Sequence, residues 1–369
     1  MSGTSIDGVD LALCDIDDKG YNVLAADTVP YTEEWRQRLA SLEHATALEY
    51  VKADVELGCL FGKIIRDFLF RINVQVDAIA SHGHTIFHQP GIGITAQIGN
   101  ADTIAAVAKL PVVSGFRTLD VALGGQGAPL VPIGDELFFG QYDACLNLGG
   151  IANISYRVDD KRIAYDICPC NMALNRLASK LGLDYDPEGQ NARRGMLDHT
   201  LCDQLNRLEY YLNPPPKSLG KEWFVSEFWP VVEAARIDTI DALRTVSDHI
   251  AWQIGSVLRR QNIGSLLVTG GGAFNTYLIE LLQKYAPKVD VTIPDELTIK
   301  YKEAIIFALL GYLRLERKYN TLASVTGACC DSIGGSVSGL VTPMVYEDTD
   351  DGDQNGTSHP LLHALLDIV

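Results

Sequence analysis

Short apolar runs alternate along the chain with longer segments of helical periodicity. The runs at 76–80, 144–148 and 265–269 each lead into a turn that contains glycine, which is typical of a buried strand. The longer segments have apolar residues three or four positions apart, as in amphipathic helices, and they cover 47–70, 171–182, 238–260, 275–285 and 302–317. Strands that alternate with helices predict an α/β protein.

The first helical segment and two glycine turns allow more specific expectations. On the helix 47–70 we expect one buried stripe, formed mostly by Leu48, Val51, Val55, Leu60, Ile64 and Phe68. The pattern of residues 1–16 predicts a polar glycine turn followed by a strand. The pattern of residues 143–158 predicts two strands joined by Gly149-Gly150. The chain has 369 residues, enough for two domains. We therefore expect two related halves whose glycine turns face a bound nucleotide.

The charge and the cysteines restrict the partners and the compartment. With 47 acidic and 30 basic residues the net charge is −17, which argues against an extended nucleic-acid or anionic-membrane surface. No apolar run reaches the roughly 18–20 residues of a membrane span. The N-terminus has no pattern of a secretory signal, so the eight cysteines are expected to be reduced thiols in the cytoplasm.

The segment 341–369 differs from the rest of the chain. It has six acidic residues and no lysine or arginine, so we expect its centre, 348–360, to be disordered. Its apolar end, 361–369, fits either a docked helical turn or disorder.

Two glycine turns have the chemistry of a phosphate site. In the segment from Gly3 to Asp10, glycines let backbone N–H groups approach phosphate, while Asp7 and Asp10 are candidate magnesium ligands. The alternative is a polar hairpin with an Asx turn. Gly270-Gly271-Gly272 lies between a strand and a helix that starts near Asn275. That turn suits a nucleotide at a helix N-terminus or is only a tight connection.

Acid–base and sugar-binding candidates lie elsewhere. Asp166 follows the apolar run 163–165, and a carboxylate there suits a general base or a helix cap. His82, His84 and His88 suit a polyhydroxylated ligand, with satisfied core histidines and a metal site as alternatives. Lys217, in a proline-rich loop, and Glu303, at the start of a predicted helix, could contact a ligand or be solvated. A further alternative is a thiol enzyme, in which Cys168 or Cys170 would act together with one of these histidines.

Several long motifs in one order make a family resemblance specific. The chain closely resembles the anhydro-N-acetylmuramic acid kinases, which belong to the actin/hexokinase/Hsp70-like ATPase superfamily. The resemblance covers residues 1 to about 336. The segments that carry it are MSGTSIDGVDLAL, ASHGHTIFHQPG, QIGN, FRTLDVALGGQGAPLVP, NLGGIANIS, PPPKSLGKEWF, VTGGGAFN and SVTGA.

The resemblance implies a fold, a reaction and a set of site residues. The fold has two RNase H-like (actin-like ATPase) domains, 1–128 completed by about 321–340 and 129–320, which flank a nucleotide cleft. Asp166 activates a water that opens the 1,6-anhydro ring of 1,6-anhydro-N-acetylmuramic acid, and O6 receives the γ-phosphoryl group of ATP. The product is N-acetylmuramic acid 6-phosphate, an intermediate of peptidoglycan recycling. ATP·Mg²⁺ is bound by Gly3, Thr4, Ser5, Ile6, Asp7, Gly8, Val9, Asp10, Gly149, Gly150, Gly270, Gly271, Gly272 and Asn275, and the amino sugar by His84, Gln126, Lys217 and Glu303.

Three departures from the family pattern bear on activity. The family usually has a few strand residues before the MSGTS segment, which here begins at Met1. Cys168 and Cys170 stand where the family commonly has glycines, and a side chain there is costly if φ is positive. The tail after about residue 340 has no recognised counterpart. These departures motivate one alternative, a nucleotide-binding protein of the same fold with impaired catalysis. The family also suggests a homodimer.

Overall fold

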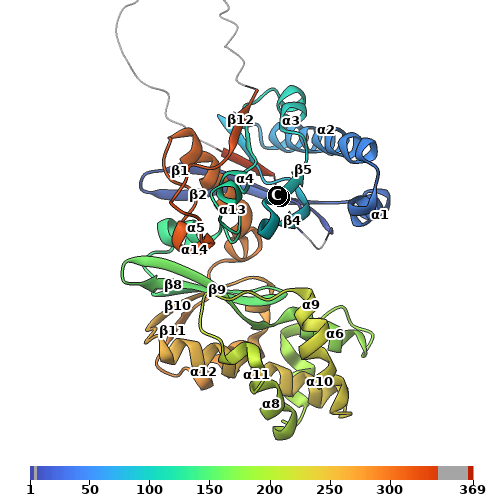
Figure 1. Cartoon of the computed structure of the whole chain (residues 1–369), viewed down its shortest axis with the longest axis vertical. Helices are drawn as coiled ribbons and strands as arrows, with labels where there is room; N and C mark the ends of the chain where they lie inside the picture. The colour runs from blue at the N-terminus through green and yellow to red at the C-terminus, as the bar shows by residue number, and fades with distance from the viewer. Residues whose placement is uncertain (4–5, 340–364, 369) are drawn as a thin grey trace, which may run out of the picture. The chain divides into compact units, whose positions relative to one another are not determined.

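The structure is a computed structural model, and it describes residues 1–3, 6–339 and 365–368. The chain forms two compact units, unit 1 (1–138 and 303–369) and unit 2 (139–302), which Figure 1 shows in the colours of the chain order. Unit 1 extends to residue 138, beyond the predicted boundary at 128, because helix α5 (Pro132–Phe138) belongs to it. The side chain of Ile306 lies against Gly134, and the Phe138 ring contacts the Tyr21 ring.

Unit 1 is built on a six-stranded sheet in the order β12-β6-β3-β13-β1-β2. β1 pairs antiparallel with β2, and β3 pairs parallel with β6. A separate hairpin is formed by β4 and β5. The strands are β1 (Gly8–Asp17), β2 (Gly20–Pro30), β3 (Ala78–Ser81), β4 (His84–Gln89), β5 (Ile94–Ile98), β6 (Val112–Ser114), β12 (Ser336–Ser338) and β13 (Leu365–Ile368).

Helices cover this sheet and close its core. The longest are α2 (Ala47–Ile72) and α13 (Glu296–Leu315), the second of which crosses the boundary between the units. α13 begins before the predicted start at 302, because Asp295 accepts the Thr298 N–H at 3.0 Å and so caps an earlier first turn. The shorter helices are α1 (Glu33–Ser41), η1 (Leu42–His44), η2 (Pro90–Ile92), α3 (Ala101–Ala108), α4 (Thr118–Ala122) and α14 (Ala323–Thr326).

The buried face of α2 differs from the predicted stripe. Leu48, Val51 and Val55 are exposed, whereas the buried positions are Ala53, Leu57, Gly58, Phe61, Gly62, Ile65 and Phe68. The two glycines explain the difference. A Cβ at Gly58 would lie 2.7 Å from the Asn100 carbonyl oxygen, and one at Gly62 would lie 2.6 Å from Val107 Cβ. The helix therefore packs closely through small residues, which the spacing of large apolar residues does not reveal.

Unit 2 contains a five-stranded mixed sheet in the order β11-β10-β7-β8-β9. Strands β7 (Ala144–Leu148), β8 (Ile151–Val158) and β9 (Lys161–Pro169) form an antiparallel meander. β10 (Ser265–Thr269) pairs parallel with β7, and β11 (Asp290–Thr292) pairs parallel with β10. An antiparallel meander continued by parallel strands is the RNase H-like arrangement, so the predicted α/β fold class is confirmed.

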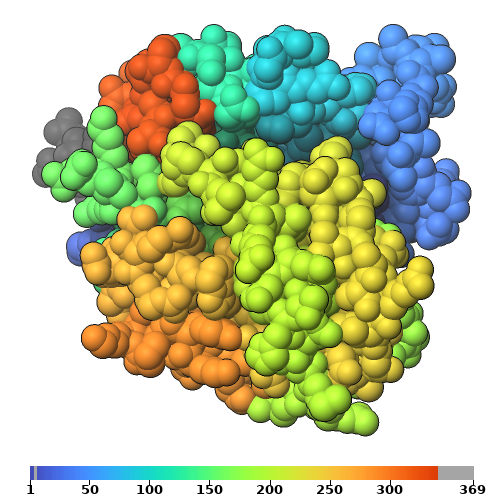
Figure 2. All heavy atoms as spheres, turned by 60° about the horizontal axis from the view of Figure 1, so that its bottom comes forward, coloured from blue at the N-terminus to red at the C-terminus, as the bar shows by residue number. Residues whose placement is uncertain are grey.

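The helices of unit 2 pack on this sheet and bury one hydrophobic core. In Figure 2 residues of unit 2, coloured green to orange, form a continuous surface. The predicted helices 171–182, 238–260 and 275–285 are confirmed as α6 (Asn171–Ser179), α11 (Thr239–Arg260) and α12 (Thr276–Tyr285). The remaining turns and helices are η3 (Pro187–Gly189), α7 (Gln190–Arg194), α8 (His199–Asn206), η4 (Glu209–Leu212), α9 (Lys221–Trp223), the π-helical turn η5 (Phe224–Phe228), α10 (Trp229–Ala234) and η6 (Gly271–Phe274).

In the apolar end of the acidic tail, the described residues 365–368 form a strand instead of the helical turn or disorder expected there. β13 lies between β1 and β3 in the sheet of unit 1, and the predicted disorder at 348–360 falls outside the described residues. Among the described residues, no helix is long and apolar enough to cross a membrane.

Candidate active site

The turn Gly149-Gly150 connects β7 to β8 and contacts the start of α6. The Gly150 carbonyl oxygen accepts the N–H groups of Cys170 at 2.8 Å and Met172 at 3.1 Å, and the Gly149 carbonyl accepts the Asn171 N–H at 3.1 Å. A Cβ at Gly150 would meet no protein atom closer than 3.9 Å. The fold therefore has room for a side chain at Gly150, and a close approach of a ligand to the backbone is what would require glycine there.

The second glycine turn of unit 2 lies against the end of β7. Gly270 has φ 80°, a conformation that L side chains rarely adopt, and a Cβ at Gly272 would lie 2.6 Å from Leu148 Cβ. Asn275 caps helix α12 by accepting the Leu278 N–H at 3.0 Å. The structure thus brings Gly270 to Gly272 beside the end of β7, which leads into Gly149-Gly150, as expected if both turns serve one ligand.

Asp166 lies on β9, and the proline-rich loop holds it. Its Oδ2 accepts the Leu219 N–H at 2.8 Å, and its own N–H donates to the Lys217 carbonyl at 3.3 Å. The Tyr210 hydroxyl donates to the Asp166 carbonyl oxygen at 2.6 Å. Within the described part of the chain, Oδ1 has no hydrogen-bond partner, so one carboxylate oxygen remains available to a water molecule.

Electrostatics around Asp166 favour a basic carboxylate. Burial raises its pKa above the usual range, and the Leu219 N–H opposes part of this effect. Lys217 does not pair with the carboxylate: its ammonium donates to the Tyr210 carbonyl at 3.0 Å and lies 4.4 Å from the centre of the Tyr210 ring. Burial lowers the pKa of Lys217. The contacts of Tyr210 and of the Leu219 backbone were missed by sequence reasoning, because they are 44 and 53 residues from Asp166.

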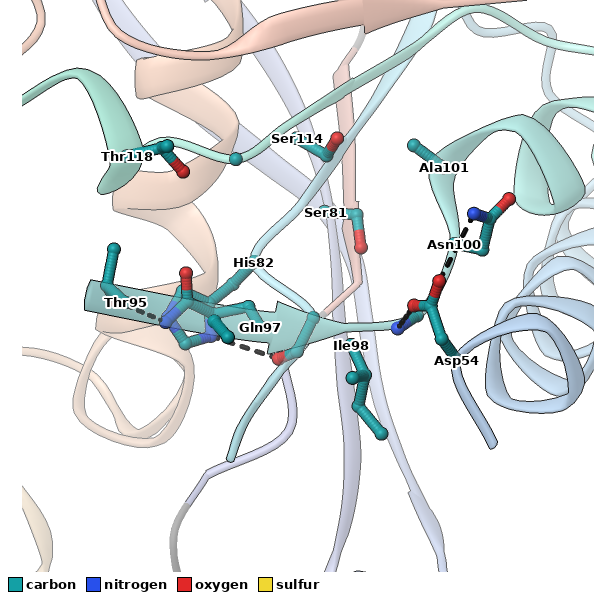
Figure 3. A pocket seen from close by; sticks show the side chains of 14 residues that line it. Asp54, Ser81, His82, Thr95, Gln97, Ile98, Asn100, Ala101, Ser114 and Thr118 are labelled. Atoms are coloured by element: carbon teal, nitrogen blue, oxygen red, sulfur yellow. Dashed lines mark hydrogen bonds between the residues drawn. The ribbon is translucent and has the colours of Figure 1, made fainter. Parts of the chain in front are cut away.

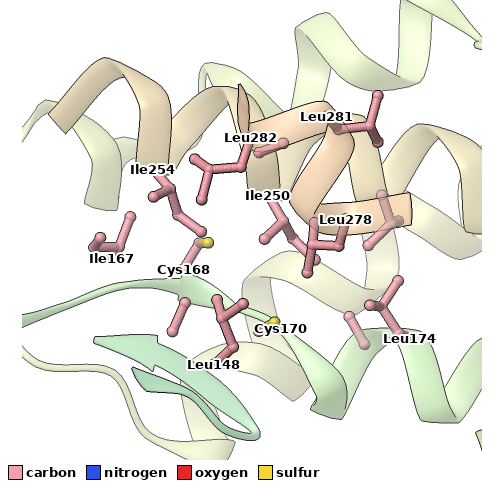
Figure 4. Close-up of a cluster of buried hydrophobic side chains, with 14 of the residues drawn as sticks. Leu148, Ile167, Cys168, Cys170, Leu174, Ile250, Ile254, Leu278, Leu281 and Leu282 are labelled. Atoms are coloured by element: carbon pink, nitrogen blue, oxygen red, sulfur yellow. The ribbon is translucent and has the colours of Figure 1, made fainter. Parts of the chain in front are cut away.

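The two cysteines after Asp166 are buried in the core of unit 2. Figure 4 shows Cys168 and Cys170 among leucine and isoleucine side chains. Neither has a positive φ, so the expected cost of a side chain in place of glycine is absent. Burial raises the pKa of Cys170 to about 12, and it also raises the pKa of Cys168. Both thiols are protonated near neutral pH, which disfavours the thiol-enzyme alternative and removes one reason for expecting impaired catalysis.

In unit 1 the described residues Gly3, Ile6 and Asp7 of the predicted phosphate turn precede β1. The Ile6 N–H donates to the Gly3 carbonyl at 3.2 Å, and Ile6 has φ 52°, which is rare for a β-branched residue. Such a conformation costs about 1–3 kcal/mol and is often found at ligand sites. The predicted residues Thr4 and Ser5 lie outside the described residues; Gly8 and Val9 begin β1.

Two carboxylates belong to this turn. Asp10 Oδ1 accepts the Thr28 hydroxyl at 2.6 Å. Burial raises the pKa of Asp10, the Thr28 contact opposes this, and the negative charge of Asp7 adds to the increase. The two acidic side chains are therefore close enough to interact. Among the described residues, no group of three or more histidine, cysteine or acidic side chains could hold a metal ion alone.

One histidine of the predicted cluster, His82, lines a polar pocket of about 250 Å³ in unit 1 (Figure 3). His82 and Ser81 line it, and the Ser81 hydroxyl is buried without a hydrogen-bond partner in the described structure. His84 does not line this pocket. Its Nδ1 is hydrogen-bonded to Ser2 Oγ at 2.7 Å, and burial lowers its pKa. Other lining residues include Asp54, Thr95, Gln97, Asn100 and Thr118.

Arg117 organises the loop beside this pocket, and sequence reasoning did not select it. It donates to His82 Nε2 at 2.9 Å and to the Gly127 carbonyl at 2.7 Å. Burial lowers the pKa of Arg117 to about 10, and the charge of Glu303 raises it. Gln126 is exposed on the loop, with its N–H bonded to the Thr326 carbonyl at 2.8 Å. Two predicted sugar-binding residues, Gln126 and Glu303, thus lie near one buried guanidinium.

Glycine turns after the buried strands β7 and β10, with a half-buried carboxylate on β9 of the same sheet, are typical of an α/β enzyme that binds a nucleotide. Residues 1–339 match the family model described as anhydro-N-acetylmuramic acid kinase. Curated relatives with that name include one from Sulfurimonas denitrificans, 33% identical over 91% of this chain and 97% of the relative. Another, from Vibrio vulnificus, is 36% identical over 89% of this chain and 94% of the relative. The chain belongs to the anhydro-N-acetylmuramic acid kinase family and is a kinase that uses ATP.

The likeness to solved structures is weaker. Component A of the (R)-2-hydroxyglutaryl-CoA dehydratase of Acidaminococcus fermentans aligns with 12% identity and a TM-score of 0.42, over 81% of this chain and 93% of that chain.

Proposed function

We propose that this chain hydrolytically opens the 1,6-anhydro ring of 1,6-anhydro-N-acetylmuramic acid and transfers the γ-phosphoryl group of ATP to O6. The products are N-acetylmuramic acid 6-phosphate and ADP. Family membership supports this choice of substrate, and the environment of Asp166 is the observation that carries the mechanism. We place the reaction in the cytoplasm, in the recycling of peptidoglycan sugars.

Asp166 acts as the general base of the hydrolytic half. Oδ2 is fixed by the Leu219 N–H, and Oδ1 takes a proton from the attacking water. The water oxygen forms a bond to the anomeric carbon while the bond from that carbon to the bridging oxygen breaks. A single carboxylate that activates water corresponds to the base of an inverting glycosidase. The released O6 attacks the γ-phosphorus, and the bond from that phosphorus to the bridging oxygen of ADP breaks.

Backbone groups provide most of the phosphate binding. Gly149, Gly150 and Gly270 to Gly272 in unit 2, and the turn from Gly3 to Asp10 in unit 1, bind ATP through N–H groups. This explains how a protein with a net charge of −17 binds a polyanion. Magnesium fits Asp7 and Asp10, since protein-bound Mg²⁺ usually has one or two carboxylates with the remaining ligands from phosphate and water. Bound there, it would neutralise charge on the phosphates.

Unit 1 contributes polar groups for the amino sugar, from the polar pocket and the loop at Arg117. The unpartnered Ser81 hydroxyl and the side chains of Gln97 and Asn100 suit the hydroxyl and amide groups of such a ligand. Gln126, Lys217 and Glu303 remain proposed contacts, and His84 is proposed to hold Ser2 and the start of the phosphate turn.

The test compares Asp166→Asn with the exposed control Asp184→Asn in the same unit. Loss of the base is expected to lower kcat by about 10²–10⁴-fold, with ATP affinity nearly unchanged, whereas the control keeps both. A near-native kcat for Asp166→Asn would show that another group is the base.

A further inference from the structure

The central position of the unit 1 sheet is occupied by the last described strand of the chain. β13 pairs antiparallel with β1, from Leu11 opposite Ile368 to Cys14 opposite Leu365. On its other side β13 pairs parallel with β3, from Ala78 opposite Leu365 to Ser81 opposite Ile368. β1 and β3 are bonded to β2 and β6 on their far sides. Without β13, two central strands would have unpaired backbone edges facing each other.

Both neighbouring strands are buried where they pair with β13, which makes such a gap unfavourable. Residues 11–14 of β1 have no exposed surface, and residues 78–81 of β3 have at most 1%. Buried backbone N–H and C=O groups are almost always paired in folded proteins. The sheet therefore needs a strand at this position, and β13 pairs with both neighbours there.

The N-terminal residues follow β13 in space, between β1 and the start of β4. Ser2 forms a parallel bridge with His84, three residues beyond Ser81, which is the β3 partner of Ile368. Met1 exchanges hydrogen bonds with Asp10 at 3.2 and 3.3 Å, next to Leu11, the β1 partner of Ile368. β13 and residues 1–2 thus lie one after the other, beside β1 on one side and beside β3 and then the start of β4 on the other, and residues 1–2 lead directly into the predicted phosphate turn.

From this juxtaposition we infer that residues 365–368 of the same chain complete the unit 1 sheet and position Gly3, where the predicted phosphate turn begins. The effect on the phosphate turn rests on the proposed function; the strand pairing does not. The strand β12, from which the tail departs, is in the same sheet, three strand spacings or about 14 Å from β13. The 25 residues from 340 to 364 can extend to about 80 Å. Because its attachment point is so close, the chain's own residues 365–368 have a high effective concentration at the position between β1 and β3. This favours pairing within one chain over pairing with the tail of a second copy.

Hydrogen–deuterium exchange on the full chain tests whether the position is occupied. Amides of 365–368 should exchange far more slowly than an unstructured peptide, at a rate comparable to that of β3. Asp367→Pro, which cannot donate to a strand ladder, should speed exchange in β1 and β3. Asp351→Pro, a matched change elsewhere in the tail, should not. Exchange of 365–368 at the rate of an unstructured peptide would overturn the inference.

Disulfide trapping tests the register and the source of the strand. Directly opposite residues in antiparallel strands have Cα atoms about 4.5–5.5 Å apart, within the range of a disulfide. Leu365→Cys is opposite the native Cys14 and should cross-link to it within one chain under mild oxidation. Leu366→Cys is the matched control, because adjacent strand residues point to opposite faces. A Cys14 cross-link between two chains would overturn the same-chain assignment, and its absence in Leu365→Cys would overturn the register.

Kinetics then test the link to the phosphate turn. Asp367→Pro should raise KM for ATP at least several-fold while Asp351→Pro leaves it unchanged. An unchanged KM in both variants would overturn the positioning role. If the unaltered chain had no kinase activity on the sugar, the proposed function would fail, while the exchange and trapping results would still decide the strand.

Discussion

Adding one methyl group at Gly150 gives a sharp test of the phosphate turn in unit 2. In the structure, a Cβ at Gly150 would have Met172 Cβ and Cε as its nearest neighbours, both at 3.9 Å, an ordinary van der Waals distance. φ of Gly150 is not positive. Gly150→Ala should therefore change the free energy of unfolding by no more than about 0.5 kcal/mol.

The effect on the ligand should be much larger. If a phosphate oxygen approaches the backbone at Gly150, the methyl group displaces it and at least one charge-assisted hydrogen bond is lost. Such a bond contributes about 1.5–3 kcal/mol, which corresponds to roughly a ten- to 150-fold weaker affinity for ATP. Gly272→Ala is the contrasting variant, because its Cβ would lie 2.6 Å from Leu148 Cβ. Overpacking of this kind costs about 1–3 kcal/mol of stability.

Two measurements on each variant separate these outcomes. Isothermal titration calorimetry with ATP and Mg²⁺ gives the affinity, and thermal unfolding without ligand gives the stability. We expect Gly150→Ala to keep its Tm and lose affinity, and Gly272→Ala to lose Tm. If Gly150→Ala bound ATP as the unaltered chain does, with the same Tm, Gly150 would have no part in phosphate binding.

Two further predictions concern Asp166 and the cysteines that follow it. Leu219→Pro removes the N–H that lowers the pKa of Asp166, so the pKa of this carboxylate should rise. The acidic limb of the kcat/KM–pH profile, where protonation of the base abolishes activity, should then move to higher pH. Leu219→Ile keeps the N–H and should not move it; an unmoved profile in Leu219→Pro would refute the contact's role. Replacing Cys168 and Cys170 together by alanine should cost about 1–2 kcal/mol of stability per buried group removed, while turnover of the folded enzyme is retained. Complete loss of turnover with an intact fold would restore the thiol mechanism.

Sequence reasoning succeeded where the signal was local. The strands at 144–148 and 265–269 and the helix at 238–260 were predicted from periodicity, since each buries a continuous face. The glycine turns after β7 and β10 were recognisable for the same reason: a buried strand that ends in glycines leaves few local alternatives.

Features that depend on close approach were missed. The buried face of α2 is set by Gly58 and Gly62, which carry no hydrophobic signal but let neighbouring backbone and side chains come within 3 Å of where a Cβ would lie. A stripe drawn through large apolar residues selected Leu48 and Val51, which are exposed. Small residues can determine a packing face as strongly as large ones.

Features that depend on distant pairing were missed as well. The partners of Asp166, Leu219 and Tyr210, act through a backbone N–H and through a hydroxyl on a backbone carbonyl. The short apolar end of the tail has no periodicity long enough to distinguish a strand from a helical turn. Its pairing with β1 and β3, two strands distant in the sequence, selects a strand there.

The central claim, that one enzyme couples ring opening to phosphorylation, is tested most directly by mass spectrometry of a reaction in ¹⁸O-water. The reaction contains ATP, Mg²⁺ and 1,6-anhydro-N-acetylmuramic acid. We predict a sugar phosphate that carries one ¹⁸O at the anomeric carbon and an unlabelled phosphoryl group on O6. An ¹⁸O label in inorganic phosphate, with the sugar unchanged, would reveal an ATPase and contradict the account.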